Sequence, residues 1–183
     1  DLLSREFAHT RRKNLLLRDL DELVNQQLAK MLFANPQRID YYDRYQEIID
    51  AYNAEQNRAT IEKTFMDLME LASSLDTEQQ RYVREGFSSD EELSVYDLLF
   101  SENLTKQEIE TIKKVSVDLL TKIKQQIAKL DHWTDKQETK AIVDNLIRNT
   151  LWQELPNSYD VSDIQTYQKK IYEYIYMRYP EVA

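Results

Sequence analysis

Residues 105–130 read TKQEIETIKKVSVDLLTKIKQQIAKL, and this stretch decides the fold. Its apolar side chains recur every three or four residues, which places them on one face of an α-helix. The stripe consists of Ile109, Ile112, Ser116, Leu119, Ile123, Gln126 and Leu130, and Val115, Leu120 and Ile127 widen it. A stripe of this kind indicates a helix that packs against other helices with coiled-coil-like contacts.

The same stretch begins with a capping box, a pattern that occurs at four sites in the chain. In a capping box a Ser or Thr hydroxyl accepts the backbone N–H three residues on, where a Glu or Gln reaches back. The four sites begin at Thr77, Ser89, Thr105 and Thr134. They predict several helices with short joints, and the sole glycine, Gly86, suits the left-handed position that follows a helix end.

Apolar periodicity and helix stop signals divide the rest of the chain into helices as well. Helices are expected over residues 4–34, 38–54, 59–75, 78–85, 90–100, 106–130, 135–154 and 162–179. The fold class is therefore all-α, an irregular helical bundle of about seven to eight helices with no sheet. We expect residues 1–35 to form a long N-terminal helix that connects to upstream domains of a longer protein, and residues 36–183 to form a C-terminal helical bundle domain.

The composition excludes several classes of protein. One glycine in 183 residues argues against glycine-rich phosphate loops and tight β-hairpins, and the lack of cysteine excludes disulfides and thiolate chemistry. A net charge of −9 argues against a surface that grips nucleic acid as a whole. No apolar run reaches the length of a membrane span and no signal peptide is present, so a cytoplasmic protein without a membrane partner is expected.

A search for catalytic or metal-binding residues finds no complete set. Glu6 and His9 have the Glu-x-x-His spacing of di-iron helical bundles, but position 129, three residues before His132, is a lysine. Neither histidine has a position that suits the activation of a nucleophile. We therefore expect no catalytic residue, metal or cofactor in this chain.

The one dense basic cluster is Arg11, Arg12 and Lys13, with Arg5 and Arg18 nearby. On a helix, three consecutive residues spread over about 200° of the surface, so they do not form a single stripe. A solvated helix face is one interpretation of the cluster. Contact with DNA phosphates or with an acidic partner is the other.

The last expected helix differs from the others because it is apolar on two sides. Ile164, Tyr167, Ile171 and Ile175 form one stripe, and Tyr172, Tyr176 and Tyr179 form a second. Such a helix is either enclosed in the core of its own domain or docked on a partner. Tyrosine suits a partly hydrated interface because its ring is buried while its hydroxyl still forms a hydrogen bond. Both interpretations of the three tyrosines stay open. Trp133, just before Thr134, is expected to be buried as the hydrophobic staple of the next helix.

Five segments occur in an order and spacing that point to a family. They are the helix pair at residues 41–75, the stretch REGFSSDEELSVYDLL at residues 84–99, the long helix described above, the tryptophan turn with its following helix, and the closing IYEYIYMRYP. Together they resemble the C-terminal helical region of the restriction (motor) subunit of type I restriction–modification enzymes. The resemblance covers residues 41–180.

This resemblance implies a role in assembly. The family's subunit is a site-specific endonuclease whose upstream domains cut DNA and translocate along it, with ATP and Mg²⁺ as cofactors, while separate subunits recognise and methylate DNA. The helical region is thought to tie this motor to the methyltransferase core. The expected partner is therefore the methyltransferase (modification) subunit, with DNA contacted through the complex and at most weakly by this chain.

Two alternatives to a docking domain remain open from the sequence. One is a module of the same motor that touches DNA phosphates through the cluster from Arg5 to Arg18, and the other is an unrelated helical scaffold. Phosphate binding weakens steeply with salt, whereas an apolar interface rich in tyrosine does not.

Overall fold

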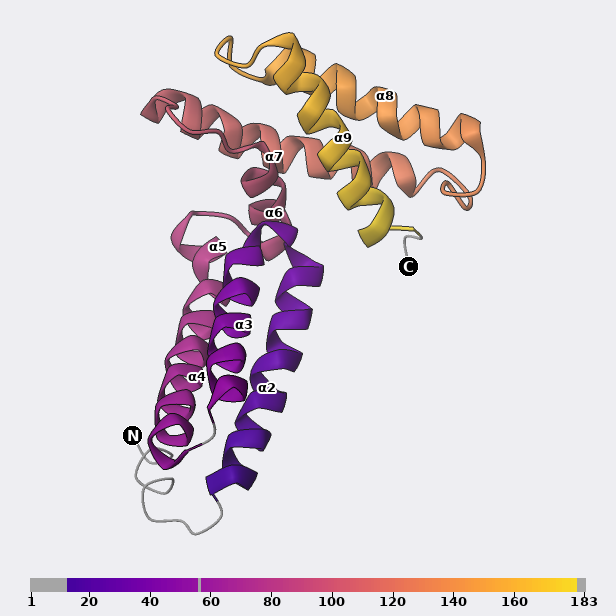
Figure 1. Cartoon of the computed structure of the whole chain (residues 1–183). Helices are drawn as coiled ribbons and strands as arrows, with labels where there is room; N and C mark the ends of the chain where they lie inside the picture. The colour runs from indigo at the N-terminus through magenta and orange to yellow at the C-terminus, as the bar shows by residue number, and fades with distance from the viewer. Residues whose placement is uncertain (1–12, 56, 181–183) are drawn as a thin grey trace. The chain divides into compact units, whose positions relative to one another are not determined.

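The computed structural model describes residues 13–55 and 57–180 of the chain (Figure 1). These residues form eight α-helices and a short 3-10 turn, and no strand occurs among them. The expectation of an all-α fold is therefore confirmed. The chain divides into two compact units, and the boundary falls between Arg81 and Tyr82.

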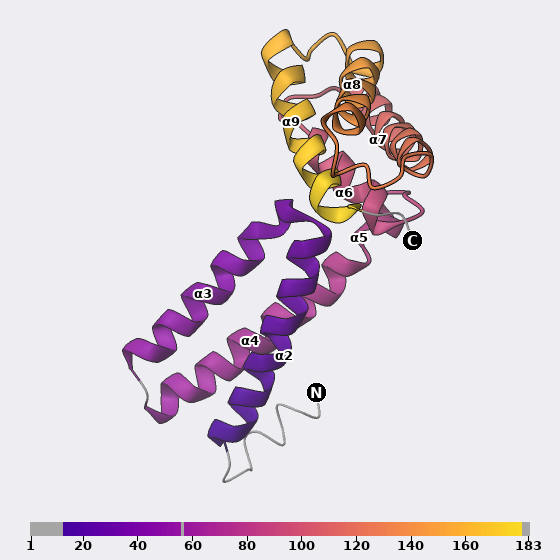
Figure 2. The ribbon, with the colours of Figure 1, turned by 90° about the vertical axis from the view of Figure 1, so that its right-hand side faces the viewer.

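The first unit consists of three long helices and the turn that joins two of them. Its elements are α2 (Lys13–Ala34), η1 (Pro36–Arg38), α3 (Ile39–Ala54) and α4 (Arg58–Gln79). Helix α4 packs against both α2 and α3, which approach one another mainly where η1 joins them (Figure 2). The buried core contains Leu17, Val24, Leu28, Met31, Tyr45, Ile48, Phe65, Leu68, Leu71 and Leu75.

The division into units differs from the boundary expected at residue 35. The apolar stripe of α2 packs along α4 and shares the core of the first unit. The connection of α2 to upstream domains stays a prediction. The sequence showed the stripe on α2 but not which helix covers it. The part of the expected first helix before Lys13 lies outside the described residues.

Helix α4 also extends further than the sequence indicated. The capping box expected at Thr77 is wrong: the Thr77 hydroxyl donates to the Ser73 carbonyl within the helix, at 2.9 Å. The buried face of α4 continues past Leu75 to Glu78, which forms an ion pair with Arg38 at 3.0 Å. This buried pair gives the last turn of α4 a partner in η1, so the helix does not end where the sequence suggested.

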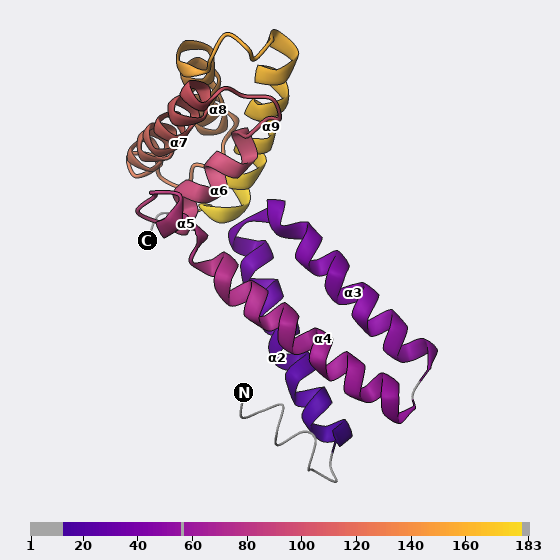
Figure 3. The same cartoon turned by 90° about the vertical axis from the view of Figure 1, so that its left-hand side faces the viewer.

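The second unit contains the remaining five helices, except for Arg81, the first residue of the first of them. They are α5 (Arg81–Arg84), α6 (Asp90–Leu99), α7 (Lys106–Ile127), α8 (Gln137–Glu154) and α9 (Val161–Arg178). Helix α7 packs against both α6 and α8, and α9 contacts α8 and α6 (Figure 3). The most deeply buried apolar residues are Leu93, Val95, Leu99, Ile112, Leu119, Ile123, Ile127, Trp133, Val143, Ile147, Leu151, Ile171 and Ile175.

Gly86 ends α5 as expected, with a φ of 84°. The Phe87 N–H donates to the Tyr82 carbonyl at 2.8 Å and the Gly86 N–H to the Val83 carbonyl at 3.1 Å, the two bonds of a Schellman motif. A left-handed conformation at this position favours glycine because other residues place a Cβ against the following carbonyl.

Two of the three capping boxes expected in this unit mark real helix starts. Ser89 caps α6, and Thr105 with Glu108 forms the complete box at α7. The box expected at Thr134 is wrong, because α8 begins at Gln137 after an extended Lys136 that makes no side-chain cap. Residues 131–135 instead form a turn in which His132 has a φ of 44° and Trp133 enters the core.

Candidate protein–protein interface on helices α8 and α9

Helix α9 has the two-sided character that its sequence indicated. Ile164, Ile171 and Ile175 are buried in the core of the second unit, so the first stripe is confirmed as a core face, and Tyr167 packs against it. Tyr174 is buried as well, although neither expected stripe included it. Its position between Ile171 and Ile175 on the same side of the helix was the available signal.

Tyr172 and Tyr176, two of the three tyrosines in the second stripe of α9, lie over the buried Trp133. The Tyr176 ring centre is 5.7 Å from that of Trp133 and the Tyr172 ring centre is 6.2 Å from it, both in edge-on geometry. Trp133 is 1% exposed, whereas Tyr172 is half-buried and Tyr176 is 39% exposed. These tyrosines therefore form a layer between the core and the solvent.

Trp133 also holds the end of α9 in place. Its indole N–H donates to the Tyr179 carbonyl at 2.6 Å, which satisfies one of the carbonyls that a helix end leaves without an internal partner. The expected burial of Trp133 is confirmed. Its expected role as the residue before the Thr134 cap is wrong, since α8 begins at Gln137 and Thr134 does not cap it.

Tyr179 lies apart from the other two tyrosines. The ammonium of Lys124, on α7, lies 5.3 Å from its ring centre, and Lys124 is also paired with Glu91 of α6. Burial and the neighbouring negative charges raise the pKa of the Tyr179 hydroxyl above its ordinary value. The structure thus brings Tyr172 and Tyr176 together on one surface and places Tyr179 in a contact among α6, α7 and α9.

A groove runs between α8 and α9 beside these tyrosines. One hollow of about 460 Å³ and another of about 300 Å³ share Lys140 and Tyr172, so they form one continuous surface. The larger is lined by Gln137, Lys140, Ala141, Asp144, Gln165, Gln168, Lys169 and Tyr172, and the smaller by Lys140, Tyr172, Glu173, Tyr176 and Met177.

The smaller hollow contains two residues that sequence reasoning missed. Met177 is 72% exposed, and a methionine beside exposed aromatic rings is a composition typical of binding surfaces. The ammonium of Lys140 lies 5.7 Å from the Tyr176 ring centre, a cation–π contact between the two helices. Nothing in the sequence indicated either residue, because neighbours in a helix point in different directions and Lys140 comes from another helix.

At the polar end of the groove, charged side chains have hydrogen-bond or ion-pair partners within the groove itself. Gln168 donates to the Asp144 carboxylate at 2.8 Å, and Lys169 lies 3.9 Å from the Glu173 carboxylate. Burial, followed by the negative charge of Asp144, raises the pKa of Tyr172. The Tyr172 hydroxyl therefore remains protonated at neutral pH and serves as a hydrogen-bond donor as well as an acceptor.

Only two residues of the basic cluster, Lys13 and Arg18, belong to the described part of the chain. Arg5, Arg11 and Arg12 lie outside it. Lys13 forms an ion pair with Glu62 of α4, and this contact, together with Arg58, lowers the pKa of the Glu62 carboxyl. The exposed Arg18 lies 3.8 Å from Asp19, so the two described members of the cluster have different surroundings.

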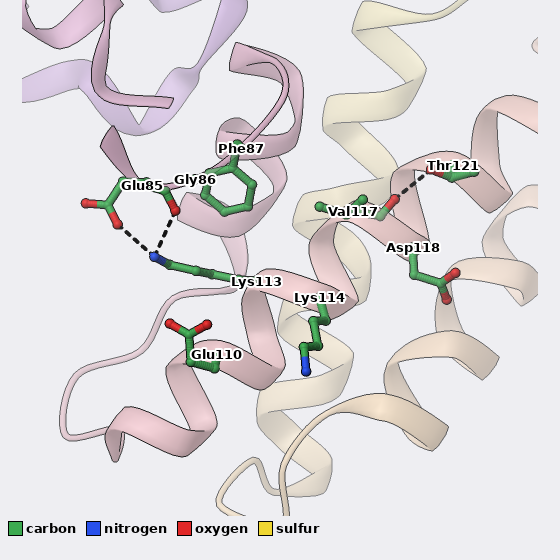
Figure 4. Close-up of a pocket in the computed structure, with 9 residues that line it drawn as sticks. All are labelled: Glu85, Gly86, Phe87, Glu110, Lys113, Lys114, Val117, Asp118 and Thr121. Atoms are coloured by element: carbon green, nitrogen blue, oxygen red, sulfur yellow. Dashed lines mark hydrogen bonds and ion pairs between the residues drawn. The ribbon is translucent and has the colours of Figure 1, made fainter. Parts of the chain in front are cut away.

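A concavity of about 540 Å³ lies between the loop after α5 and the middle of α7 (Figure 4). Lys113 crosses it and donates to both the carboxylate and the backbone carbonyl of Glu85, each at 3.0 Å. Its ammonium also lies 5.9 Å from the ring centres of Phe87 and Tyr96. These contacts fasten α7 to the loop, so the Lys113 charge is already matched within the chain.

Within residues 13–55 and 57–180, no group of three or more His, Cys, Asp or Glu side chains lies close enough to hold a metal ion. No helix in the same residues is long and apolar enough to cross a lipid bilayer. Glu6 and His9 fall outside the described part of the chain, and His132 is on the exposed turn before α8, 3.6 Å from Asp131.

Comparison with known proteins defines the class to which this all-α chain belongs. A family model described as type I restriction enzyme HindI endonuclease subunit-like, C-terminal, matches residues 1–179. The chain therefore belongs to this family of C-terminal domains of type I restriction enzyme subunits. The match includes the first 40 residues, which the resemblance seen in the sequence did not cover. No curated protein and no solved structure matches the chain.

Proposed function

We propose that this domain docks the ATP-dependent translocase and endonuclease of a type I restriction enzyme onto its methyltransferase core. The observation that carries the proposal is the surface formed by Tyr172, Tyr176 and Met177 beside the α8–α9 groove. Tyrosine and methionine are enriched in protein interfaces, and exposed aromatic groups held by a rigid layer beneath them make effective anchors. Here the rigid layer is Trp133.

The proposed division of labour within the enzyme follows from the family. The upstream parts of the subunit would bind ATP and Mg²⁺ and cut DNA, and this domain would hold them on the modification subunits without binding a cofactor of its own. DNA would then reach this domain only through the complex. Of the two described members of the basic cluster, Lys13 is paired with Glu62 and Arg18 lies near Asp19.

The double substitution Tyr172→Ser and Tyr176→Ser tests the proposal. In the full restriction subunit it is expected to weaken attachment to the methyltransferase about 30-fold, or about 2 kcal/mol at 1.4 kcal/mol per tenfold. The loss arises because two aromatic anchors disappear from the surface. Binding is measured by titration of the purified methyltransferase, and the melting temperature of the variant is measured in parallel.

A suitable control is Tyr42→Ser in α3, because Tyr42 is 37% exposed, close to the 39% of Tyr176, but lies in the other unit. The control should assemble like the unchanged protein. If the double variant melts much earlier yet attaches normally, the tyrosines are core residues and the docking proposal fails. Attachment that weakens steeply with added salt in the unchanged protein would instead favour contact with phosphates.

A further inference from the structure

The α8–α9 groove carries one charged side chain, Lys140, that has no ion-pair partner among the residues that the structure describes. Four charged residues line it, and three of them have polar partners within the groove: Asp144 accepts from Gln168, and Lys169 faces Glu173. Lys140 differs. Within the described residues its ammonium takes part in no ion pair and instead lies over the Tyr176 ring.

Lys140 also has a central position. It lines both hollows, between the polar end of the groove and the end formed by Tyr172, Tyr176 and Met177. The groove-lining residues of α9 extend from Gln165 to Met177, which corresponds to about 18 Å at 1.5 Å per residue. That length suits about three turns of a partner helix laid in the groove.

Covering the groove would remove water from Lys140. An ammonium that loses its hydration is costly unless it gains an opposite charge, and a cation–π contact alone replaces only part of that hydration. A partner that seats an apolar side chain against Tyr176 and Met177 therefore places its neighbouring residues beside an ammonium that requires a carboxylate. The two surfaces are complementary in charge when the partner residue that lies beside the Lys140 ammonium is Asp or Glu.

We propose that the groove binds a helical segment of the modification subunit that carries a carboxylate next to a bulky apolar side chain. The carboxylate pairs with Lys140, and the apolar side chain packs between Tyr172, Tyr176 and Met177. This inference rests on the docking function proposed above and specifies the chemistry of its partner. Since the chain has a net charge of −9, a carboxylate is repelled by much of the surface, and Lys140 thus fixes the register of docking.

Charge reversal in the assembled enzyme tests this inference. Lys140→Glu in the full restriction subunit is expected to weaken attachment to the methyltransferase at least 10-fold, because the like charges repel. Lys140→Met keeps the packing of the stem on Tyr176 and removes only the charge, so it should weaken attachment less than Lys140→Glu does. The matched control is Lys136→Glu, which makes the same charge change at an exposed position outside the groove and should change attachment less than twofold.

A zero-length carbodiimide cross-link identifies the partner group directly, because it joins an amine to a carboxylate only when the two are in contact. We expect Lys140 to be joined to an Asp or Glu of the modification subunit. Normal attachment of Lys140→Glu, or a Lys140 that forms no cross-link in the assembled enzyme, would overturn the inference. If Tyr172→Ser with Tyr176→Ser still weakens attachment in that case, the docking function stands and only the acidic partner is refuted. If neither Lys140→Glu nor the double tyrosine substitution weakens attachment, both the docking function and the acidic partner are refuted.

Discussion

Replacement of Trp133 by alanine is expected to destabilise the second unit by about 3 to 5 kcal/mol, the usual cost of removing a fully buried aromatic side chain. Trp133 is 1% exposed, contacts two tyrosine rings of α9 and donates to the Tyr179 carbonyl at 2.6 Å. Its loss would leave a cavity beneath α9 and an unsatisfied carbonyl at the end of that helix. Urea unfolding followed by circular dichroism measures the change.

The chain offers a matched control for this prediction in its second tryptophan. Trp152 on α8 is 49% exposed, so Trp152→Ala should change the free energy of unfolding by less than about 0.5 kcal/mol. Trp133→Phe separates the two contributions, because it retains an aromatic ring and removes the indole N–H. If Trp133→Ala costs no more than Trp152→Ala, then Trp133 does not support the tyrosine surface.

The second large effect is expected in the first unit, at the buried ion pair between Arg38 and Glu78. Arg38 is 3% exposed, and the Glu78 carboxylate accepts from it at 3.0 Å and from Arg81 at 2.8 Å. Glu78→Ala removes this carboxylate and leaves the Arg38 guanidinium buried without it, which typically costs about 3 to 5 kcal/mol. The measurement is again the free energy of unfolding in urea.

An exposed ion pair of the same unit provides the comparison. Glu70 accepts from Arg44 at 2.9 Å, but both side chains are exposed to water. Glu70→Ala should therefore cost at most about 1 kcal/mol, because solvent screens the charges of exposed pairs. Equal effects of Glu78→Ala and Glu70→Ala would show that burial of Arg38 contributes little to the stability of the first unit.

The fold could largely be predicted from the sequence because its helices are amphipathic and few residues break them. The cap at Thr105 was recognisable, since the hydroxyl and the Glu108 carboxylate need only local geometry to form the box. The similar pattern at Thr77, which has Gln80 in place of a glutamate, failed because a distant residue, Arg38, offers Glu78 a buried partner that holds the turn helical. Local patterns do not report such tertiary contacts.

The candidate site was only partly visible in the sequence. The spacing of Tyr172 and Tyr176 showed that they share a face of α9, but the same spacing assigned Tyr179 to that face. In the structure Tyr179 lies apart from Tyr172 and Tyr176, because its backbone departs from helical geometry after the end of α9 and its ring packs against Lys124. Lys140 comes from another helix, and its place over Tyr176 depends on how α8 packs on α9, which no periodicity encodes.

The most direct measurement of docking is a competition between this chain and the complete restriction subunit for the purified methyltransferase. The folded 183-residue chain should displace the full subunit as its concentration rises, and the chain with Tyr172→Ser and Tyr176→Ser should require about 30-fold more to do so. Displacement by the unchanged chain that depends on both tyrosines would establish the surface as the attachment site. No displacement at saturating concentrations of the folded chain would contradict the proposed docking function.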